Sequence, residues 1–183
     1  MNRRSFLALA CGAVTLTACG FKLRGQQNYV FKRLAIVGAA APVAARLTRM
    51  VQGGSDTVIV SSTADADAIL TLSEGRGQNV LVINSLGIAA EYQLNYSLNY
   101  RLVGADGTVL IPPSVIVLDR AMTYSEQYSL AKAEESDLLY ADMQNDAVDQ
   151  LTRRLAVVHS LHPAPGEQIP AVAPRAPLPP PPL

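Results

Sequence analysis

The sequence predicts an α+β fold, in which a mixed sheet of four to five strands carries two helices packed on one face. Apolar and polar residues alternate without a break over 91–102, which is the pattern of a long strand with one covered face. Two other stretches have apolar residues at helical spacing, and short apolar runs lie between these patterned segments. The predicted order of elements is β-α-β-β-β-β-α.

The first part of this fold is a strand–helix–strand unit. The apolar run 34–37 predicts a buried strand, and Pro42 suits the first turn of a helix that follows it. That helix would direct Arg46 outward and end at the glycines 53–54. The run 57–60 predicts a second strand, and the helical connection favours parallel pairing of the two strands.

The second part contains the remaining strands and a long helix. An apolar run at 68–72 predicts a strand that 80–83 would continue beyond a bend at 75–77. The alternating strand comes next, and 115–118 begins a further strand. A helix over about 131–158 has acids in its first half and arginines in its last turn, as the helix dipole favours.

The N-terminus has the pattern of a bacterial lipoprotein signal. Arg3 and Arg4 precede an apolar stretch that is too short to span a bilayer, and small residues then lead to Cys19. This resembles a lipobox, in which the cysteine takes an S-diacylglycerol and an N-palmitoyl group and becomes the first mature residue. Several acyl chains anchor a protein to a membrane far more firmly than one. An ordinary secretory signal is the alternative, and both Sec and twin-arginine export stay open.

These features divide the chain into four parts. We expect a signal peptide at 1–18, a lipid-anchored linker at 19–32, an α/β domain at 33–160 and a disordered, proline-rich tail at 161–183. The tail holds nine prolines from residue 163 onward, which favours an extended spacer.

Residues suited to catalysis or metal binding are few. His159 and His162 lie beside the proline tail, where we expect a solvated helix end rather than a metal pair. Asp65-Ala66-Asp67 precedes a strand, a position at which aspartate commonly stabilises a turn. Acylation would block the thiol of Cys19. The sequence therefore predicts no enzyme, no metal and no cofactor.

The composition of the chain also argues against nucleic-acid binding. Charged residues make up 16% of the chain, the formal net charge is zero and tryptophan is absent. The chain therefore lacks both the basic surface and the stacking platforms that nucleic-acid binding requires.

Three motifs resemble the LptE family of lipopolysaccharide-assembly lipoproteins. The segment CGFKLR at 19–24 resembles the family's mature N-terminus, C-G-[FW]-x-L-R. The segments AEYQ at 90–93 and LAK at 130–132 resemble two further family motifs and occur in the same order. The resemblance spans about 19–158, which is nearly all of the predicted folded part.

The resemblance implies both a function and a location. Members of this family are outer-membrane lipoproteins that plug and help to assemble the LptD β-barrel, in a one-to-one complex. They take part in lipopolysaccharide transport to the outer leaflet, and Gly20 after the cysteine favours the outer membrane by the same resemblance. This chain would then be lipid-anchored on the periplasmic side and within the barrel lumen. An auxiliary subunit of another envelope transport system is the alternative, and a lipoprotein hydrolase comes third.

Lys132 is the candidate lipopolysaccharide-binding residue, because it matches the lysine of the family's L-A-K motif. A solvated lysine near a helix start is the alternative. Arg101 and Arg120 are further candidate cations if they lie at neighbouring strand ends. Where the family often has a basic residue before A-E-Y-Q, this chain has Asn84-Ser85-Leu86-Gly87, which weakens the expectation of direct lipopolysaccharide binding.

Overall fold

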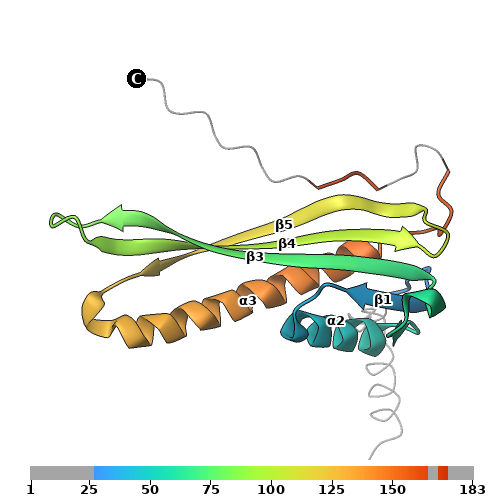
Figure 1. Ribbon diagram of the computed structural model, residues 1–183, viewed down its shortest axis with the longest axis horizontal. Helices are drawn as coiled ribbons and strands as arrows, with labels where there is room; N and C mark the ends of the chain where they lie inside the picture. The colour runs from blue at the N-terminus through green and yellow to red at the C-terminus, as the bar shows by residue number, and fades with distance from the viewer. Residues whose placement is uncertain (1–26, 165–168, 173–183) are drawn as a thin grey trace, which may run out of the picture.

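A computed structural model describes residues 27–164 and 169–172, and its elements follow the predicted order (Figure 1). The strands are β1 (Arg33–Val37), β2 (Val58–Val60), β3 (Ala68–Ile83), β4 (Ala89–Gly104) and β5 (Val109–Thr123). The helices are α2 (Ala41–Gly54) and α3 (Ser129–Leu155), and the short 3₁₀ helices are η1 (Thr63–Asp65) and η2 (Glu126–Tyr128). The α+β fold class and the order β-α-β-β-β-β-α are confirmed.

The five strands form one mixed sheet in the order β2-β1-β3-β4-β5. β1 pairs in parallel with both β2 and β3, as the helical connection predicts, whereas β3, β4 and β5 pair antiparallel. The last three strands are much longer than the first two, so they extend beyond the β1–α2–β2 unit as an antiparallel ribbon (Figure 1).

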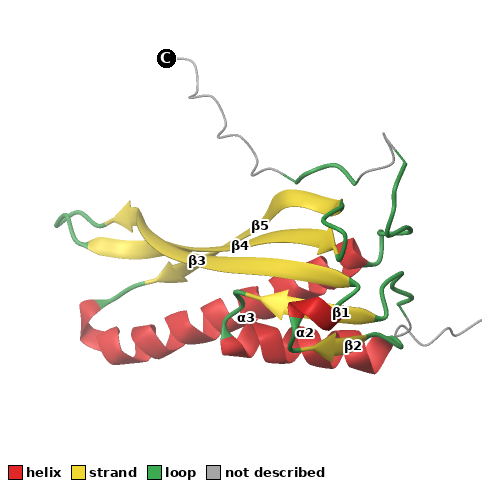
Figure 2. Cartoon of the chain, turned by 45° about the vertical axis from the view of Figure 1, so that its right-hand side comes forward, coloured by secondary structure: helices red, strands yellow, loops and turns green. Residues whose placement is uncertain are grey.

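Both helices lie on one face of the sheet, and no helix of the described residues lies on the opposite face (Figures 1 and 2). The core between these layers is apolar, and its burial supplies the main driving force for folding. Its largest fully buried side chains are Phe31, Leu34, Leu47, Leu70, Leu94, Tyr96, Leu98, Leu102, Leu110, Ile111, Met143 and Leu151. From Leu94 to Leu102, every second residue of β4 is buried, which confirms the alternating pattern.

Two predicted features differ from the structure. β3 continues through Gly75–Gly77 with unbroken pairing to β4, and its register shifts only after Val80. A Cβ at position 75 would lie 2.6 Å from Ser97 Oγ, so this glycine permits close approach of β4 rather than a bend. Arg46 is also not directed simply outward, because its Nη2 pairs with Asp149 of α3 at 2.8 Å and so joins the two helices.

β5 begins at Val109, ahead of the predicted start at 115, and α3 spans Ser129–Leu155 rather than 131–158. The sequence did not predict the first part of β5 because it contains Pro112 and Pro113, and proline lacks the N–H donor that a central strand needs. β5 is an edge strand, however, and an edge position tolerates proline.

Candidate functional site

Lys132 lies in the first turn of α3, next to the end of β5. Its Nζ donates hydrogen bonds to Thr123 Oγ1 at 3.0 Å and to Glu135 Oε2 at 2.7 Å. The side chain is only 18% exposed, so these two contacts hold the ammonium group against the end of the sheet. An ammonium group has three N–H donors, so one donor remains for an anionic ligand. The charge of Lys132 is already paired with Glu135, and any such ligand must compete with this acid.

The loop between β3 and β4 is an ordered turn. The side-chain oxygen of Asn84 accepts hydrogen bonds from the backbone N–H groups of Leu86 at 2.9 Å and Ile88 at 3.0 Å. Gly87 has a φ of +77°, a conformation that favours glycine. The result is a turn that displays Leu86, which is 80% exposed.

The strand segments beside this turn are also apolar and exposed. We call the exposed apolar residues of this hairpin the apolar tip: Val80, Leu81, Val82, Ile83, Leu86 and Ile88. Successive residues of a strand point to opposite faces, so the exposure of 80–83 means that this part of β3 displays apolar side chains on both faces of the hairpin. A contiguous apolar surface of this kind is typical of an interaction site. The sequence predicts the strand 80–83 but not its exposure, because a continuous apolar run is typical of a strand buried on both faces.

The start of α3 lies at the same end of the molecule as the apolar tip (Figure 1). Leu130 and Leu138 are exposed on this half of the helix. Further along α3, the hydroxyl of Tyr140 donates to the backbone oxygen of Gly77 at 2.7 Å, and the Arg76 guanidinium lies 5.0 Å from the Tyr140 ring centre. These contacts fasten the helix to the base of the hairpin. We call the apolar tip together with residues 128–138 the distal end.

The other candidate cations do not join Lys132. The antiparallel register places Arg101 opposite Thr71 of β3, whereas Arg120 lies opposite Leu94, so the two arginines are not at neighbouring strand ends. Arg120 Nη2 instead pairs with Asp146 at 2.7 Å and with Asp142 at 3.5 Å, both on α3. Lys132 is thus the only one of the three candidates at the distal end.

The face of the sheet without helices is polar along β3 and β4. Its exposed or half-exposed side chains include Thr71, Ser73, Asn95, Ser97, Asn99 and Arg101. The opposite side of β4 is buried under α3, so the strand separates an apolar core from a surface of small polar groups.

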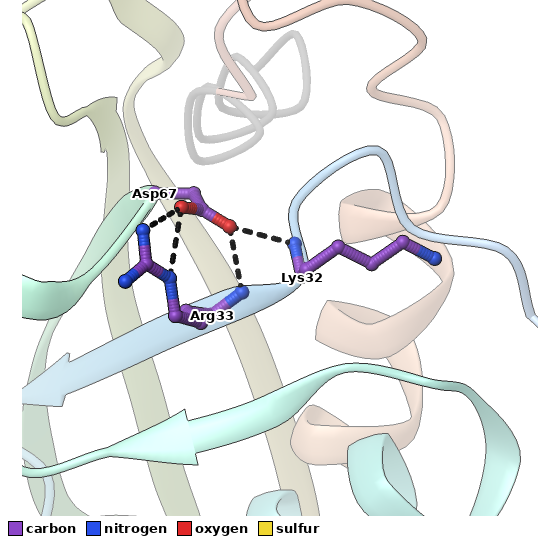
Figure 3. A network of polar contacts seen from close by, with 3 residues as sticks. All are labelled: Lys32, Arg33 and Asp67. Carbon is purple, nitrogen blue, oxygen red and sulfur yellow. Dashed lines mark hydrogen bonds and ion pairs between the residues drawn. The ribbon is translucent and has the colours of Figure 1, made fainter.

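Asp67 has a structural role, but it joins two strands rather than stabilising its own turn. Its carboxylate accepts hydrogen bonds from the backbone N–H groups of Lys32 at 3.0 Å and Arg33 at 2.9 Å, and it pairs with the Arg33 guanidinium at 2.8 Å (Figure 3). This contact with Arg33 lowers the pKa of the Asp67 carboxyl below its usual 3.8. Asp67 therefore fastens the start of β1 to the start of β3.

The two histidines are exposed after α3, and the nearest described acid to His162 Nε2 is Asp106 at 3.4 Å. Within 27–164 and 169–172, no cluster of histidine, cysteine and acidic side chains could hold a metal ion. Nor does any helix in these ranges have the length and hydrophobicity needed to cross a bilayer. Cys19 and the rest of residues 1–26 lie outside the described residues, so acylation of Cys19 stays a prediction.

Comparison with known proteins identifies the family. The family model described as LptE, lipopolysaccharide-assembly, matches residues 27–155. The LPS-assembly lipoprotein LptE of Photorhabdus laumondii is 29% identical over 164 residues, covering 86% of this chain and 89% of that protein. The corresponding protein of Pectobacterium atrosepticum is 30% identical over 165 residues, with 87% and 89% covered.

Solved structures agree with the fold. Lipoprotein B of Nitrosomonas europaea superimposes with a TM-score of 0.63 at 31% identity, covering 75% of this chain and 91% of that one. The rare lipoprotein B of Shewanella oneidensis superimposes with a TM-score of 0.58 at 20% identity, covering 68% and 93%. The chain belongs to the LptE family of lipopolysaccharide-assembly lipoproteins and, as a member of that family, is not an enzyme.

Proposed function

We propose that this lipoprotein is lipid-anchored in the outer membrane through acylated Cys19 and plugs an LptD-type β-barrel. In that position it would help the barrel to assemble and to pass lipopolysaccharide to the outer leaflet. The observation that carries the proposal is the distal end, where the apolar tip exposes apolar side chains on both faces of β3 in a domain that is otherwise well packed. An isolated domain gains nothing from such a surface, whereas a partner that encloses the hairpin would cover it.

The polar face of the sheet also suits a place inside a barrel. The inner wall of an outer-membrane barrel is polar, because only its outer surface meets lipid. Small hydroxyl and amide groups on β3 and β4 can form hydrogen bonds with such a wall, directly or through water. An apolar tip and a polar sheet face therefore fit different parts of one enclosing partner.

Lys132 is the residue that we propose for contact with lipopolysaccharide. The lipid A and inner-core regions of this ligand carry phosphate groups, which a lysine can bind as a point charge. The contact of Lys132 with Glu135 at 2.7 Å would lower the affinity for phosphate, because a phosphate would have to replace or share that interaction. No second cation of the candidate set lies beside it, so we expect moderate rather than tight binding by the isolated domain.

The plug role can be tested with a soluble Cys19→Ala form made without residues 1–18. We expect this form to make a stable one-to-one complex with an LptD-type barrel, because the folded domain, rather than the acyl chains, carries the proposed interface. Leu86→Asp should weaken the complex at least tenfold by placing a charge in the apolar tip. Val58 on β2 is also apolar and exposed, but it lies outside the apolar tip. Val58→Asp is therefore the matched control and should leave binding unchanged. A soluble form that binds no such barrel would remove the plug role.

A further inference from the structure

β5 forms one border of the sheet and is its long open edge. The opposite border, β2, has three residues, whereas β5 has fifteen. A long edge strand presents unpaired N–H and C=O groups, which can pair with a strand of another chain. The question is therefore how this edge is protected in the monomer.

Two parts of β5 carry recognised protection against edge pairing. Pro112 and Pro113 lack N–H donors near its start, and Asp119 and Arg120 add charge near its end. Between them lies Ser114-Val115-Ile116-Val117, an uncharged stretch of high strand propensity. The Val117 side chain is 49% exposed. The sequence of β5 therefore leaves this middle stretch open to strand addition.

The C-terminal segment Ile169–Val172 lies on this middle stretch. The backbone N–H of Val115 donates to the Val172 oxygen at 2.9 Å, and the Val172 N–H donates to Ser114 Oγ at 3.1 Å. The Ser114 hydroxyl in turn donates to the Pro112 oxygen at 2.9 Å, which fixes the position of the acceptor. The tail segment thus occupies the backbone N–H of Val115, a group that an added strand would need.

Ile169 anchors the other end of this segment. It packs against the core beside Leu110 at the start of β5 and Val158 after α3. Ile169 and Val172 are both partly buried, whereas the two residues between them are exposed. One apolar side chain and two backbone contacts therefore hold the segment in place.

We propose that Ile169–Val172 is an intramolecular strap that closes the β5 edge against pairing with β5 of a second copy of this chain. The strap suits this role because it is itself a poor edge for further pairing. Pro170 lies within it and Pro174 follows it in the sequence, and neither residue has an N–H group to offer a further strand. Without the strap, two copies could pair their β5 strands antiparallel about a two-fold axis. This proposal does not depend on the plug role.

Two truncations of the soluble Cys19→Ala form test the strap. A chain ending at Ala164 lacks the strap, whereas a chain ending at Val172 keeps it and loses only the residues beyond. We expect the chain ending at Ala164 to form dimers at concentrations where the chain ending at Val172 and the full chain stay monomeric. Size-exclusion chromatography with light-scattering detection measures the molar mass of each. In dilute, monomeric samples, the Val115 amide should exchange with solvent roughly tenfold faster in the chain ending at Ala164.

Two substitutions separate edge pairing from general loss of stability. Val117→Lys in the chain ending at Ala164 places a charge on the open stretch and should restore the monomer. Ile169→Asp in the full chain keeps its length but removes the apolar anchor, and should reproduce part of the association. Equal Val115 exchange in all three chain lengths, or dimerisation that Val117→Lys leaves unchanged, would overturn the proposal.

Discussion

The hydroxyl of Tyr96 on β4 donates a hydrogen bond to Glu74 Oε2 on β3 across 2.9 Å. The same oxygen accepts from Gln144 Nε2 of α3 at 2.8 Å, and Glu74 Oε1 accepts from the backbone N–H of Ala40, before α2, at 3.0 Å. One carboxylate therefore ties both helices to the sheet. Burial raises the pKa of Tyr96, and the contact with Glu74 raises it further, so the phenol stays protonated as a donor.

Replacing Glu74 with alanine should destabilise the fold. The change leaves the donors of Tyr96, Gln144 and Ala40 without their acceptor, and we expect the free energy of unfolding to fall by about 2–4 kcal/mol. Tyr96→Phe removes only one hydrogen bond and should cost about 1 kcal/mol. Urea denaturation measures both values. A Glu74→Ala variant within about 0.5 kcal/mol of the parent would contradict the proposed network.

Asp67 should make stability depend on pH in the acid range. Its folded-state pKa is below the usual 3.8, mainly because of the Arg33 guanidinium. The unfolded state therefore binds the proton more readily, so the stabilisation is complete above the unfolded-state pKa and is lost as the pH falls through the folded-state pKa. Asp67→Asn should thus be less stable than the parent at pH 7, with a difference that shrinks towards pH 2. Asp65→Asn is the control. If the difference in the free energy of unfolding between Asp67→Asn and the parent did not vary with pH, the proposed role of the Asp67–Arg33 contact would be contradicted.

Gly38 and Gly53 should respond oppositely to alanine. Gly38 has a φ of +80°, and a Cβ there would overlap the backbone oxygen of Leu72. We expect Gly38→Ala to lower the free energy of unfolding by about 2–4 kcal/mol, through strain and displacement of β3. Gly53 lies in the last turn of α2 with open space around it, so Gly53→Ala should add about 0.5–1 kcal/mol. Thermal denaturation distinguishes these outcomes, and a harmless Gly38→Ala would contradict the β1–β3 geometry.

Substitutions that remove the charge of Lys132 and of Glu135 should have opposite effects on lipopolysaccharide binding. Lys132→Met keeps the apolar stem but removes the charge, and we expect binding about tenfold weaker. Glu135→Gln removes the competing acid and should strengthen binding several-fold. Arg49→Met, which removes an exposed cation on α2, controls for net charge. The melting temperature should change little in all three variants. Unchanged binding by Lys132→Met would exclude this residue from the site.

The sequence predicted the fold where a local pattern reports directly on burial. The alternation over 91–102 was sufficient because β4 is central, with one face on the core and the other open. It did not predict the start of β5, because the proline rule for strands applies differently at an edge. Glu74 was also missed, since a charged residue within a strand gives no sign that its three partners come from distant segments.

The candidate site was predicted only in part. The L-A-K motif pointed to Lys132, but the sequence could not show that Glu135 lies one helical turn away with its carboxylate on the ammonium group. The apolar tip was missed for a related reason. A run such as 80–83 reads as a buried strand, and only the structure shows that the β3 side chains beyond Gly77 are exposed.

Affinity isolation of the tagged full-length chain from outer membranes tests the central claim most directly. The account predicts that an LptD-type barrel co-purifies with this lipoprotein in a one-to-one ratio and that Leu86→Asp lowers the yield of barrel, while Val58→Asp does not. Recovery of the chain without any such barrel, or with the subunits of a different envelope transporter, would contradict it.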